Sequence, residues 1–360
     1  MRGNDLAPDP ELAQRLAQAL SPWFVANQRD LEWRRTRDPY AIWVSEIMLQ
    51  QTRVDTVRAY YRAFLGRFPD VGALAAADEE SVLQAWSGLG YYRRARLLHR
   101  GARYVVEELA GEVPATGEGL RAIPGVGRYT AGAIASIAHD RPVPLVDGNV
   151  ARVLSRIRAI TDPRLQGADA EAHWRWAEAI LRAGSPRILA QALMELGATV
   201  CTPQRPSCDA CPVAAMCQAR AQGLSQTIPA PKVKAAAPED QLWAVAIVRK
   251  GKILVERRPS EGLLAGLWCL PLIARAGAKP RPAAIKAATG VAVRQVAEAP
   301  GSEEPVKHVF SHRVWKLWPC TARALGEAPA PAGMMWIAAG ERPPGGIPKV
   351  TEKVLARLGY

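Results

Sequence analysis

Apolar residues recur at helical spacing along most of the first 220 positions. The segments that show this spacing are Leu12–Leu20, Ala41–Phe64, Glu79–Leu89, Arg94–Leu109, Ala131–Ile137, Val150–Ile160, Ala170–Ala183 and Arg187–Val200. Short breaks rich in Gly, Pro and Asp separate them, and no fixed repeat is present. The pattern predicts a compact helical domain over residues 1–226.

The periodicity changes after residue 226. Residues 227–240 (TIPAPKVKAAAPED) are rich in Pro, Ala and charge, which predicts a linker. Beyond it, Leu242–Val248 and Ile253–Arg257 flank Lys250-Gly251 as in a β-hairpin, and Val306–Trp318 alternates like a strand. A short helix is expected at Pro282–Thr289. We therefore expect a second, smaller domain of α+β or α/β class over residues 241–360.

Charge is distributed unevenly between these two parts. The 360 residues carry a formal charge of +13, which favours an anionic partner such as nucleic acid. Residues 1–231 hold 27 arginines, 24 acidic residues and no lysine, whereas residues 232–360 hold ten lysines, ten arginines and ten acidic residues. Chemistry that needs a lysine in the helical domain is thereby excluded.

No segment of the sequence predicts secretion or membrane insertion. Residues 1–10 have no apolar core, and the longest apolar stretch, near residues 263–274, is far shorter than a membrane span. We expect a soluble, cytoplasmic protein without a membrane partner.

Glu46 interrupts an otherwise apolar helical segment, IWVSEIML. No cation lies within four residues of it, so burial would raise the pKa of its carboxyl and favour the protonated acid. A neutral carboxyl can act as a general acid. A glutamate on the wet face of an amphipathic helix is the simpler interpretation of this segment alone.

Asp147 precedes the helical segment Val150–Ile160 in the sequence VDGNV. Asp is a favoured N-cap residue, and a helix N-terminus also favours the ionised carboxylate. A neutral Glu46 paired with a charged Asp147 would provide the two environments used to cleave glycosidic bonds. The spacing does not establish that the two residues face each other.

The segment IPGVGRYTAG (123–132) places Gly125 and Gly127 just before a helix. Glycines let the backbone approach a ligand, and the N–H groups at the start of a helix can bind phosphate. An ordinary helix–helix turn is the alternative; the basic composition and a cysteine cluster favour contact with the DNA backbone.

Four cysteines lie within 17 residues: Cys201, Cys208, Cys211 and Cys217. In a reducing compartment this density predicts metal binding rather than disulfides. Four thiolates can hold zinc or an iron–sulfur cluster, and their number does not decide between the two.

These motifs together resemble the helix-hairpin-helix DNA glycosylases that carry a [4Fe–4S] cluster, and within them the MutY-type adenine glycosylases. The resemblance is carried by VSEIMLQQT (44–52), GLGYYRRAR (88–96), IPGVGRYTAG (123–132), VDGNVARVL (146–154) and the cysteine spacing, over roughly residues 11–225. The segments GLLAGLW (262–268) and HVFSH (308–312) resemble a Nudix-like domain that reads 8-oxoguanine. The resemblance implies a mainly α protein with a helix-hairpin-helix domain, a cluster loop and a smaller α/β Nudix-like domain.

The resemblance also implies catalytic roles. Glu46 would protonate adenine as its N-glycosidic bond breaks, and Asp147 would stabilise the deoxyribose cation or bond to it transiently. Tyr129 and Asn149 would support that site. The four cysteines would ligate a [4Fe–4S] cofactor.

Contacts to DNA follow from the same resemblance. Arg34 and Gln191 would line the adenine pocket, while Leu49, Gln51 and Tyr91 would probe the base stack as the base is flipped out.

In the second domain, Phe310, Ser311 and His312 would recognise 8-oxoguanine. The expected activity is monofunctional removal of adenine mispaired with 8-oxoguanine or guanine in double-stranded DNA, by a monomeric bacterial protein that associates with the nucleoid through DNA.

Three alternatives bear on this interpretation. Endonuclease III-type enzymes use a lysine in the hairpin motif to form a Schiff base, but the matching residue here is Tyr129. A Nudix hydrolase needs carboxylates for Mg²⁺, and none lies between Gly262 and Gly290. A non-catalytic DNA-binding protein would tolerate replacement of Glu46 or Asp147.

Overall fold

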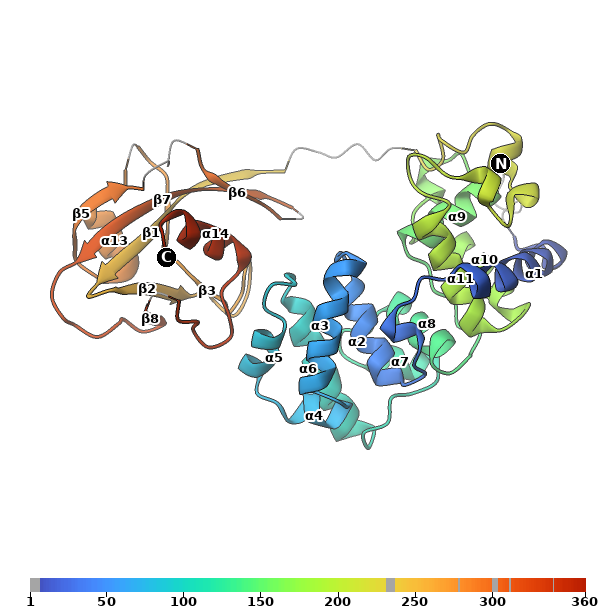
Figure 1. Ribbon diagram of the computed structural model, residues 1–360, viewed down its shortest axis with the longest axis horizontal. Coiled ribbons are helices and arrows are strands. Elements are labelled where there is room, and N and C mark those ends of the chain that lie inside the picture. The colour runs from blue at the N-terminus through green and yellow to red at the C-terminus, as the bar shows by residue number, and fades with distance from the viewer. Residues whose placement is uncertain (1–6, 231–236, 278, 300–303, 311, 339) are drawn as a thin grey trace. The chain divides into compact units, whose positions relative to one another are not determined.

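The computed structural model describes residues 7–230, 237–277, 279–299, 304–310, 312–338 and 340–360 (Figure 1). The chain divides into two compact units. The first comprises residues 1–76 and 97–233, and the second comprises residues 77–96 and 234–360. The predicted linker 227–240 falls partly on residues 231–236, which lie outside the described residues, so the predicted domain limits stay predictions.

The described part of the first unit is helical. Its helices are α1 (Pro10–Asn27), α2 (Pro39–Leu49), α3 (Val54–Arg67), α4 (Val71–Ala76), α7 (Gly117–Ala122), α8 (Arg128–Ile137), α9 (Gly148–Ile157), α10 (Glu171–Arg182), α11 (Pro186–Thr199) and α12 (Gln218–Ala221). Helix α6 (Arg93–Glu108) crosses the boundary between the units, and short 3-10 turns include η2 (Glu32–Arg34). No helix among the described residues is long and apolar enough to cross a membrane.

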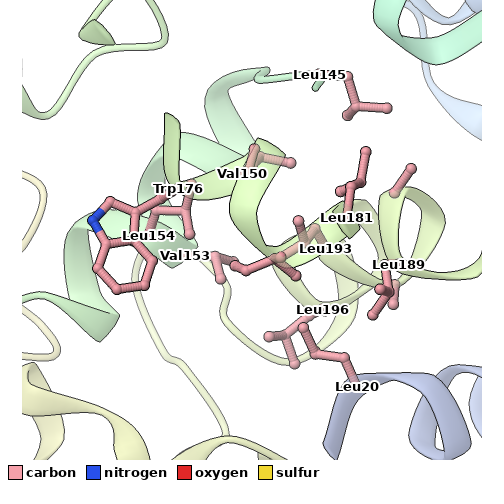
Figure 2. Packing of buried hydrophobic residues seen from close by; sticks show 14 of the residues in the cluster. Leu20, Leu145, Val150, Val153, Leu154, Trp176, Leu181, Leu189, Leu193 and Leu196 are labelled. Carbon is pink, nitrogen blue, oxygen red and sulfur yellow. The ribbon is translucent and has the colours of Figure 1, made fainter. Parts of the chain in front are cut away.

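The core of this unit lies between α1, α9, α10 and α11 (Figure 2). The apolar faces of these helices meet there, and the residues labelled in Figure 2 include Leu20, Val150, Trp176, Leu181 and Leu196. Helix α11 contacts α1, α8, α9 and α10. It therefore packs against two of the three helices that carry candidate catalytic residues, α8 with Tyr129 and α9 with Asn149, which Asp147 caps; the third is α2 with Glu46.

A glycine in α8 permits a close backbone approach that places this site. A Cβ on Gly132 would lie 2.0 Å from the carbonyl oxygen of Pro144. Only glycine lets α8 pack this tightly against the strand-like stretch that leads into Asp147. The short separation between α8 and the segment before α9 therefore depends on Gly132 having no side chain.

The described part of the second unit contains one mixed sheet. Its strands are β1 (Glu239–Arg249), β2 (Lys252–Arg257), β3 (Trp268–Cys269), β4 (Leu272–Ala274), β5 (Val293–Glu298), β6 (Val306–Val309), β7 (Val314–Ala324) and β8 (Met334–Ala338). They pair in the order β3-β2-β1-β7-β5, with β4 beside β1, β6 beside β7 and β8 beside β2. Helices α5 (Glu79–Ala85), α13 (Pro282–Thr289) and α14 (Lys349–Arg357) complete the described elements of this unit.

Strand β1 is buried on both faces because alternate residues enter different cores. Ala244 and Ala246 belong to the cluster that also contains Val350 and Val354 of α14. Trp243 and Val245 belong to the cluster formed with α13. One helix therefore supplies side chains to each of the two cores that flank β1, as expected for a sheet buried on both sides.

The predicted fold class is confirmed: a mainly helical unit and a smaller α/β unit. Two segments contain a break that their patterns do not show. The helical segment Ala41–Phe64 is two helices separated by residues 50–53, and Gln51 there has a φ of 58°. The strand-like segment Val306–Trp318 contains two antiparallel strands, β6 and the start of β7.

Candidate active site

A cavity of about 600 Å³ opens in the first unit between η2, α2, α8, α11 and the start of α9. It gathers eight of the residues named from the sequence: Arg34, Glu46, Leu49, Gln51, Tyr129, Asp147, Asn149 and Gln191. These positions are up to about 160 residues apart in the chain. The structure thus brings together both candidate carboxylates and their predicted supporting residues.

Glu46 is carried into the interior by helix α2. The helix begins with Pro39, and the side chain of Asp38 caps it by accepting hydrogen bonds from the N–H groups of Tyr40 and Ala41. Every residue from Tyr40 to Met48 is buried, so no face of the helix is wet. Glu46 itself is 5% exposed, which excludes the solvent-facing interpretation of this carboxylate.

The environment of Glu46 favours a proton on its carboxyl group. Burial raises the pKa of Glu46 to about 7, and the charge of Asp147 adds to this rise. A hydrogen bond from Tyr129 and the charge of Arg34 act in the opposite direction. Burial outweighs them, so a large fraction of Glu46 carries a proton at neutral pH.

Tyr129 donates a hydrogen bond to the Glu46 carboxyl. The distance from Tyr129 Oη to Glu46 Oε2 is 2.8 Å. The same hydroxyl lies 3.4 Å from Met194 Sδ. Burial, with the charges of Glu46 and Asp147, raises the pKa of Tyr129 well above its usual value. Tyr129 therefore remains a neutral hydrogen-bond donor.

Asp147 forms the N-cap of α9, as the sequence predicts. Its Oδ1 accepts a hydrogen bond of 2.7 Å from the N–H of Val150, and its Oδ2 accepts one of 3.0 Å from Asn149 Nδ2. These bonds and the positive end of the helix dipole stabilise a negative charge on Asp147. The cavity thus pairs a buried carboxyl whose pKa is raised with a second carboxyl that caps a helix.

Arg34 and Gln191 line the same cavity, and the structure adds two charged residues that the sequence did not single out. Glu195, one turn after Gln191, accepts hydrogen bonds from Arg29 and Arg34. Its signal in the sequence resembles that of Glu46: a carboxylate within an apolar helical run, ALMELGA. Arg29 shows no such signal.

Leu49 and Gln51 lie at the rim of this cavity, where α2 ends. Leu49 is half-buried and Gln51 is exposed. The left-handed φ of Gln51 turns the chain away from the axis of α2. Tyr91, the third predicted stack-probing residue, lies in the other unit, where it is 48% exposed and also has a positive φ of 50°.

The hairpin Ile123–Gly127 uses its two glycines differently. Gly125 has a φ of 86°, and a Cβ there would lie 2.7 Å from Leu97 Cβ. Gly127 is the N-cap of α8, and a Cβ there would meet open space. Both glycines are exposed. The start of α8 is therefore accessible to an anion such as a phosphate.

The four clustered cysteines surround one small cavity beyond the far end of α9. Burial raises the pKa of the Cys211 thiol to about 11, and the other three cysteines add to this rise. Among the described residues, no three His, Cys, Asp or Glu side chains form a group that could hold a single metal ion. All four thiols nevertheless line this one cavity, and four thiolates are a donor set that suits an iron–sulfur cluster.

Two arginines of α9 connect this cysteine loop to the rest of the unit. Arg152 donates to the carbonyl of Cys201 at 2.8 Å and to Asn149 Oδ1 at 2.8 Å. Arg156 is fully buried and donates to Cys201 Sγ at 3.3 Å and to the carbonyl of Thr202. A continuous hydrogen-bonded chain therefore runs from Asp147 through Asn149 and Arg152 to Cys201.

The predicted 8-oxoguanine residues belong to the second unit. The ring of Phe310 packs edge-on against His308 and Trp315, with centroid distances of 4.5 and 5.0 Å. His312 is exposed. Ser311 lies outside the described residues.

Comparison with known proteins identifies two family matches. Residues 44–178 match the HhH-GPD superfamily of base excision DNA repair proteins, and residues 242–357 match the NUDIX domain. Adenine DNA glycosylase of Mus musculus is 38% identical over 377 residues, covering 88% of this chain and 73% of the mouse protein. The chain belongs to the adenine DNA glycosylase family. The resemblance seen in the sequence motifs is confirmed.

Other members of the adenine DNA glycosylase family differ in how much of their length is matched. The Homo sapiens protein is 41% identical over 71% of this chain, which covers 57% of the human protein. The Buchnera aphidicola (subsp. Schizaphis graminum) protein is 33% identical over 71% of this chain and 74% of its own length. The chain thus spans little more than half the length of the human relative.

Solved structures support the fold of the helical part. A thermostable thymine-DNA glycosylase is 26% identical with a TM-score of 0.54, covering 59% of this chain and 98% of that chain. Endonuclease III, in a trapped covalent intermediate with DNA, is 20% identical with a TM-score of 0.50, covering 60% and 99%. At this identity the second likeness concerns the fold alone.

Proposed function

We propose that the protein is a monofunctional DNA glycosylase that removes adenine mispaired with 8-oxoguanine or guanine, in base excision repair. One observation carries the proposal: a buried Glu46 whose pKa is about 7 shares a cavity with a carboxylate held at a helix N-terminus. Its relatives in animals and bacteria are adenine DNA glycosylases.

In this mechanism Glu46 donates its proton to a ring nitrogen of adenine. The N-glycosidic bond then breaks, its electron pair leaves with the neutral base, and positive charge develops on the deoxyribose. The carboxylate of Asp147 stabilises that charge. Water adds to C1′ and gives a proton to the carboxylate of Glu46, which restores the acid and yields free adenine and an abasic site. Tyr129 and Asn149 hold the two carboxyl groups in place.

Residues 1–231 offer no lysine that could continue the reaction to strand cleavage. A Schiff base requires a primary amine near C1′, and residues 1–231 contain no lysine. Tyr129 occupies the position of the lysine in endonuclease III-type enzymes. The product is therefore an intact strand with an abasic site, in contrast to the bifunctional alternative.

DNA binding would use both units. Arg34 and Gln191 would contact the flipped adenine, Leu49, Gln51 and Tyr91 would probe the stack, and Gly125 and Gly127 would face phosphate.

Recognition of the opposite base is assigned to Phe310, Ser311 and His312.

A [4Fe–4S] cluster would be held by Cys201, Cys208, Cys211 and Cys217. Its bonds to the four thiolates would stabilise the fold of the 201–217 loop, and the hydrolysis itself would be carried out by protein residues.

The decisive experiment compares the wild type, Glu46→Gln and the matched control Glu112→Gln, an exposed glutamate that does not line the cavity. Each is incubated with duplexes that carry adenine opposite 8-oxoguanine, guanine or thymine, and free adenine is measured. We expect Glu46→Gln to bind the mispaired duplexes and release no adenine, while Glu112→Gln retains wild-type release.

Strand breaks in the wild-type reaction should appear only after mild alkali. Adenine release by Glu46→Gln at the wild-type rate would refute the proposed mechanism. Strand cleavage without alkali would favour the bifunctional alternative.

A further inference from the structure

Glu195 is a buried charge at the wall of the cavity with no assigned part in the chemistry. It lies in α11, one turn after Gln191, and its side chain is fully buried. Glu195 Oε1 accepts from the backbone N–H of Arg29 at 3.0 Å and from Arg29 Nε at 2.9 Å. Its Oε2 accepts from Nη2 of Arg29 and from Nη2 of Arg34, each at 2.7 Å.

This network fixes the position of the Arg34 guanidinium. Arg34 also donates through Nη1 to the carbonyl of Arg29 at 3.1 Å, and it lies over the ring of Phe24 at 5.3 Å. Its side chain is only 10% exposed. Two charge-assisted bonds and one ring contact leave little rotational freedom for a residue that borders the site.

Glu195 keeps its charge despite complete burial. Burial alone would raise the pKa of Glu195, but the hydrogen bonds from Arg29 and Arg34 outweigh it and lower the pKa to about 2. One carboxylate therefore faces two guanidinium groups at every pH relevant to catalysis. Removal of this carboxylate would leave two cations at the wall without a counter-charge.

Charged and titratable groups from several elements line the cavity with Glu46. They include Tyr129 at the start of α8, Asp147 before α9, Glu195 from α11, and Arg29 and Arg34 from the segment that contains η2. Of the described residues that shift the pKa of Glu46, Arg34 carries a positive charge, and this charge favours the ionised form. Glu195 bonds the same guanidinium and offsets that charge.

We propose that Glu195 is a positioning residue that holds Arg34 at the cavity wall and offsets its charge, so that Glu46 retains its proton for the reaction. The inference rests on the proposed general-acid function of Glu46. The inference predicts that Glu195 affects the protonation of Glu46. A purely structural contact between α11 and the 29–34 segment would have no such effect.

The test uses two substitutions that shift the same equilibrium in opposite directions. Glu195→Gln keeps the shape and a hydrogen-bond acceptor but removes the negative charge, so the pKa of Glu46 should fall. Arg29→Gln removes one positive charge from a side chain that is 40% exposed, so Glu195 can offset Arg34 more fully and the pKa of Glu46 should rise. Glu195→Asp preserves the charge and serves as the conservative variant.

The first readout is the single-turnover rate of adenine release against pH. The alkaline limb of the profile should move down by roughly half a pH unit in Glu195→Gln and up in Arg29→Gln. Glu195→Asp should restore the wild-type limb, and the exposed control Glu112→Gln should leave it unchanged.

The second readout does not require activity. The ¹³C resonance of the Glu46 carboxyl, assigned by its loss in Glu46→Gln, is titrated in the free protein. A lower titration midpoint in Glu195→Gln and a higher one in Arg29→Gln would support the inference, even if the wild type releases no adenine. Failure of the wild type to release adenine would refute only the proposed function. Midpoints that stay at the wild-type value in folded variants would overturn the role of Glu195.

Discussion

At the scale of single residues, the hydrogen bond of 2.8 Å from Tyr129 Oη to Glu46 Oε2 acts directly on the proton of the candidate acid. The hydroxyl stabilises the ionised form of Glu46, whereas burial stabilises the protonated form. Because burial prevails, the acid form is available at neutral pH and is lost as pH rises through about 7. Adenine release should therefore decline on the alkaline side of neutrality.

Tyr129→Phe separates these two effects. Loss of the hydroxyl removes a hydrogen bond that lowers the pKa of Glu46, so this pKa should rise and the alkaline limb of the pH–rate profile should move up by roughly half to one pH unit. The measurement is single-turnover adenine release between pH 6 and pH 9. A limb that stays in place or moves down would show that Tyr129 does not act on the proton of Glu46.

The apolar neighbours of Glu46 made it a candidate, but its segment alone favoured a solvent-facing glutamate, and the resemblance to a family gave it the role of the acid. Glu195 has the same local signal, but its role depends on Arg29 and Arg34, which lie 166 and 161 residues away. A local pattern identifies a carboxylate in an apolar segment. It does not show whether that carboxylate is buried or which distant cation binds it.

At the scale of elements, the short break between α2 and α3 illustrates the limit of periodicity. Apolar spacing continues from Ala41 to Phe64, yet the helix ends at Leu49 because Gln51 adopts a left-handed conformation. Neither proline nor glycine marks this turn. The break places Leu49 and Gln51 at the rim of the cavity, so the missed boundary lies at the candidate site.

The carboxylate of Asp147 caps helix α9 and, in the proposed reaction, also stabilises the sugar cation. Two substitutions distinguish capping from catalysis. Asn is as good an N-cap as Asp, so Asp147→Asn should abolish adenine release with little change in the free energy of unfolding. Asp147→Ala should also lose about 1 kcal/mol of stability. Denaturant unfolding and adenine release are measured for both variants.

Equal destabilisation of the Asn and Ala variants would contradict this division. Retained activity in Asp147→Asn would show that the charge at this position is not required.

The sheet shows a second limit at this scale. The β1–β2 hairpin follows from the Lys250-Gly251 turn between alternating residues, and it is observed. The parallel pairing of β1 with β7 joins residues such as Glu239 and Val314, which are separated by most of the second unit. Alternation identifies strands, but it carries no information about which distant strand becomes the partner.

At the scale of the whole molecule, the proposed function divides between the units, with catalysis in the helical unit and recognition of the opposite base in the α/β unit. The helical unit has the cavity, and the α/β unit has most of the net positive charge and no carboxylates between Gly262 and Gly290. Family, fold class and the two-part organisation of motifs were accessible from the sequence. The composition of the cavity wall required the fold.

His312→Ala tests whether the second unit reads the opposite base. His312 is exposed, so its loss should leave stability unchanged. We expect the ratio of adenine release opposite 8-oxoguanine to that opposite guanine to fall about fivefold or more, as for the loss of a base-reading contact. Arg294→Ala, at an exposed position of the same unit, is the control. An unchanged ratio would exclude His312 from recognition.

Because residues 1–231 contain no lysine, reagents that act at lysine can distinguish this stretch from the rest of the chain. A protease that cuts only after lysine has no cleavage site in this stretch, even when the chain is unfolded. Such digestion yields one fragment, ending at Lys232, that contains Glu46, Asp147 and all four clustered cysteines. Amine-reactive labels are confined to the amino terminus and to residues 232–360, so a probe can report on the α/β unit while every side chain of the cavity stays unmodified.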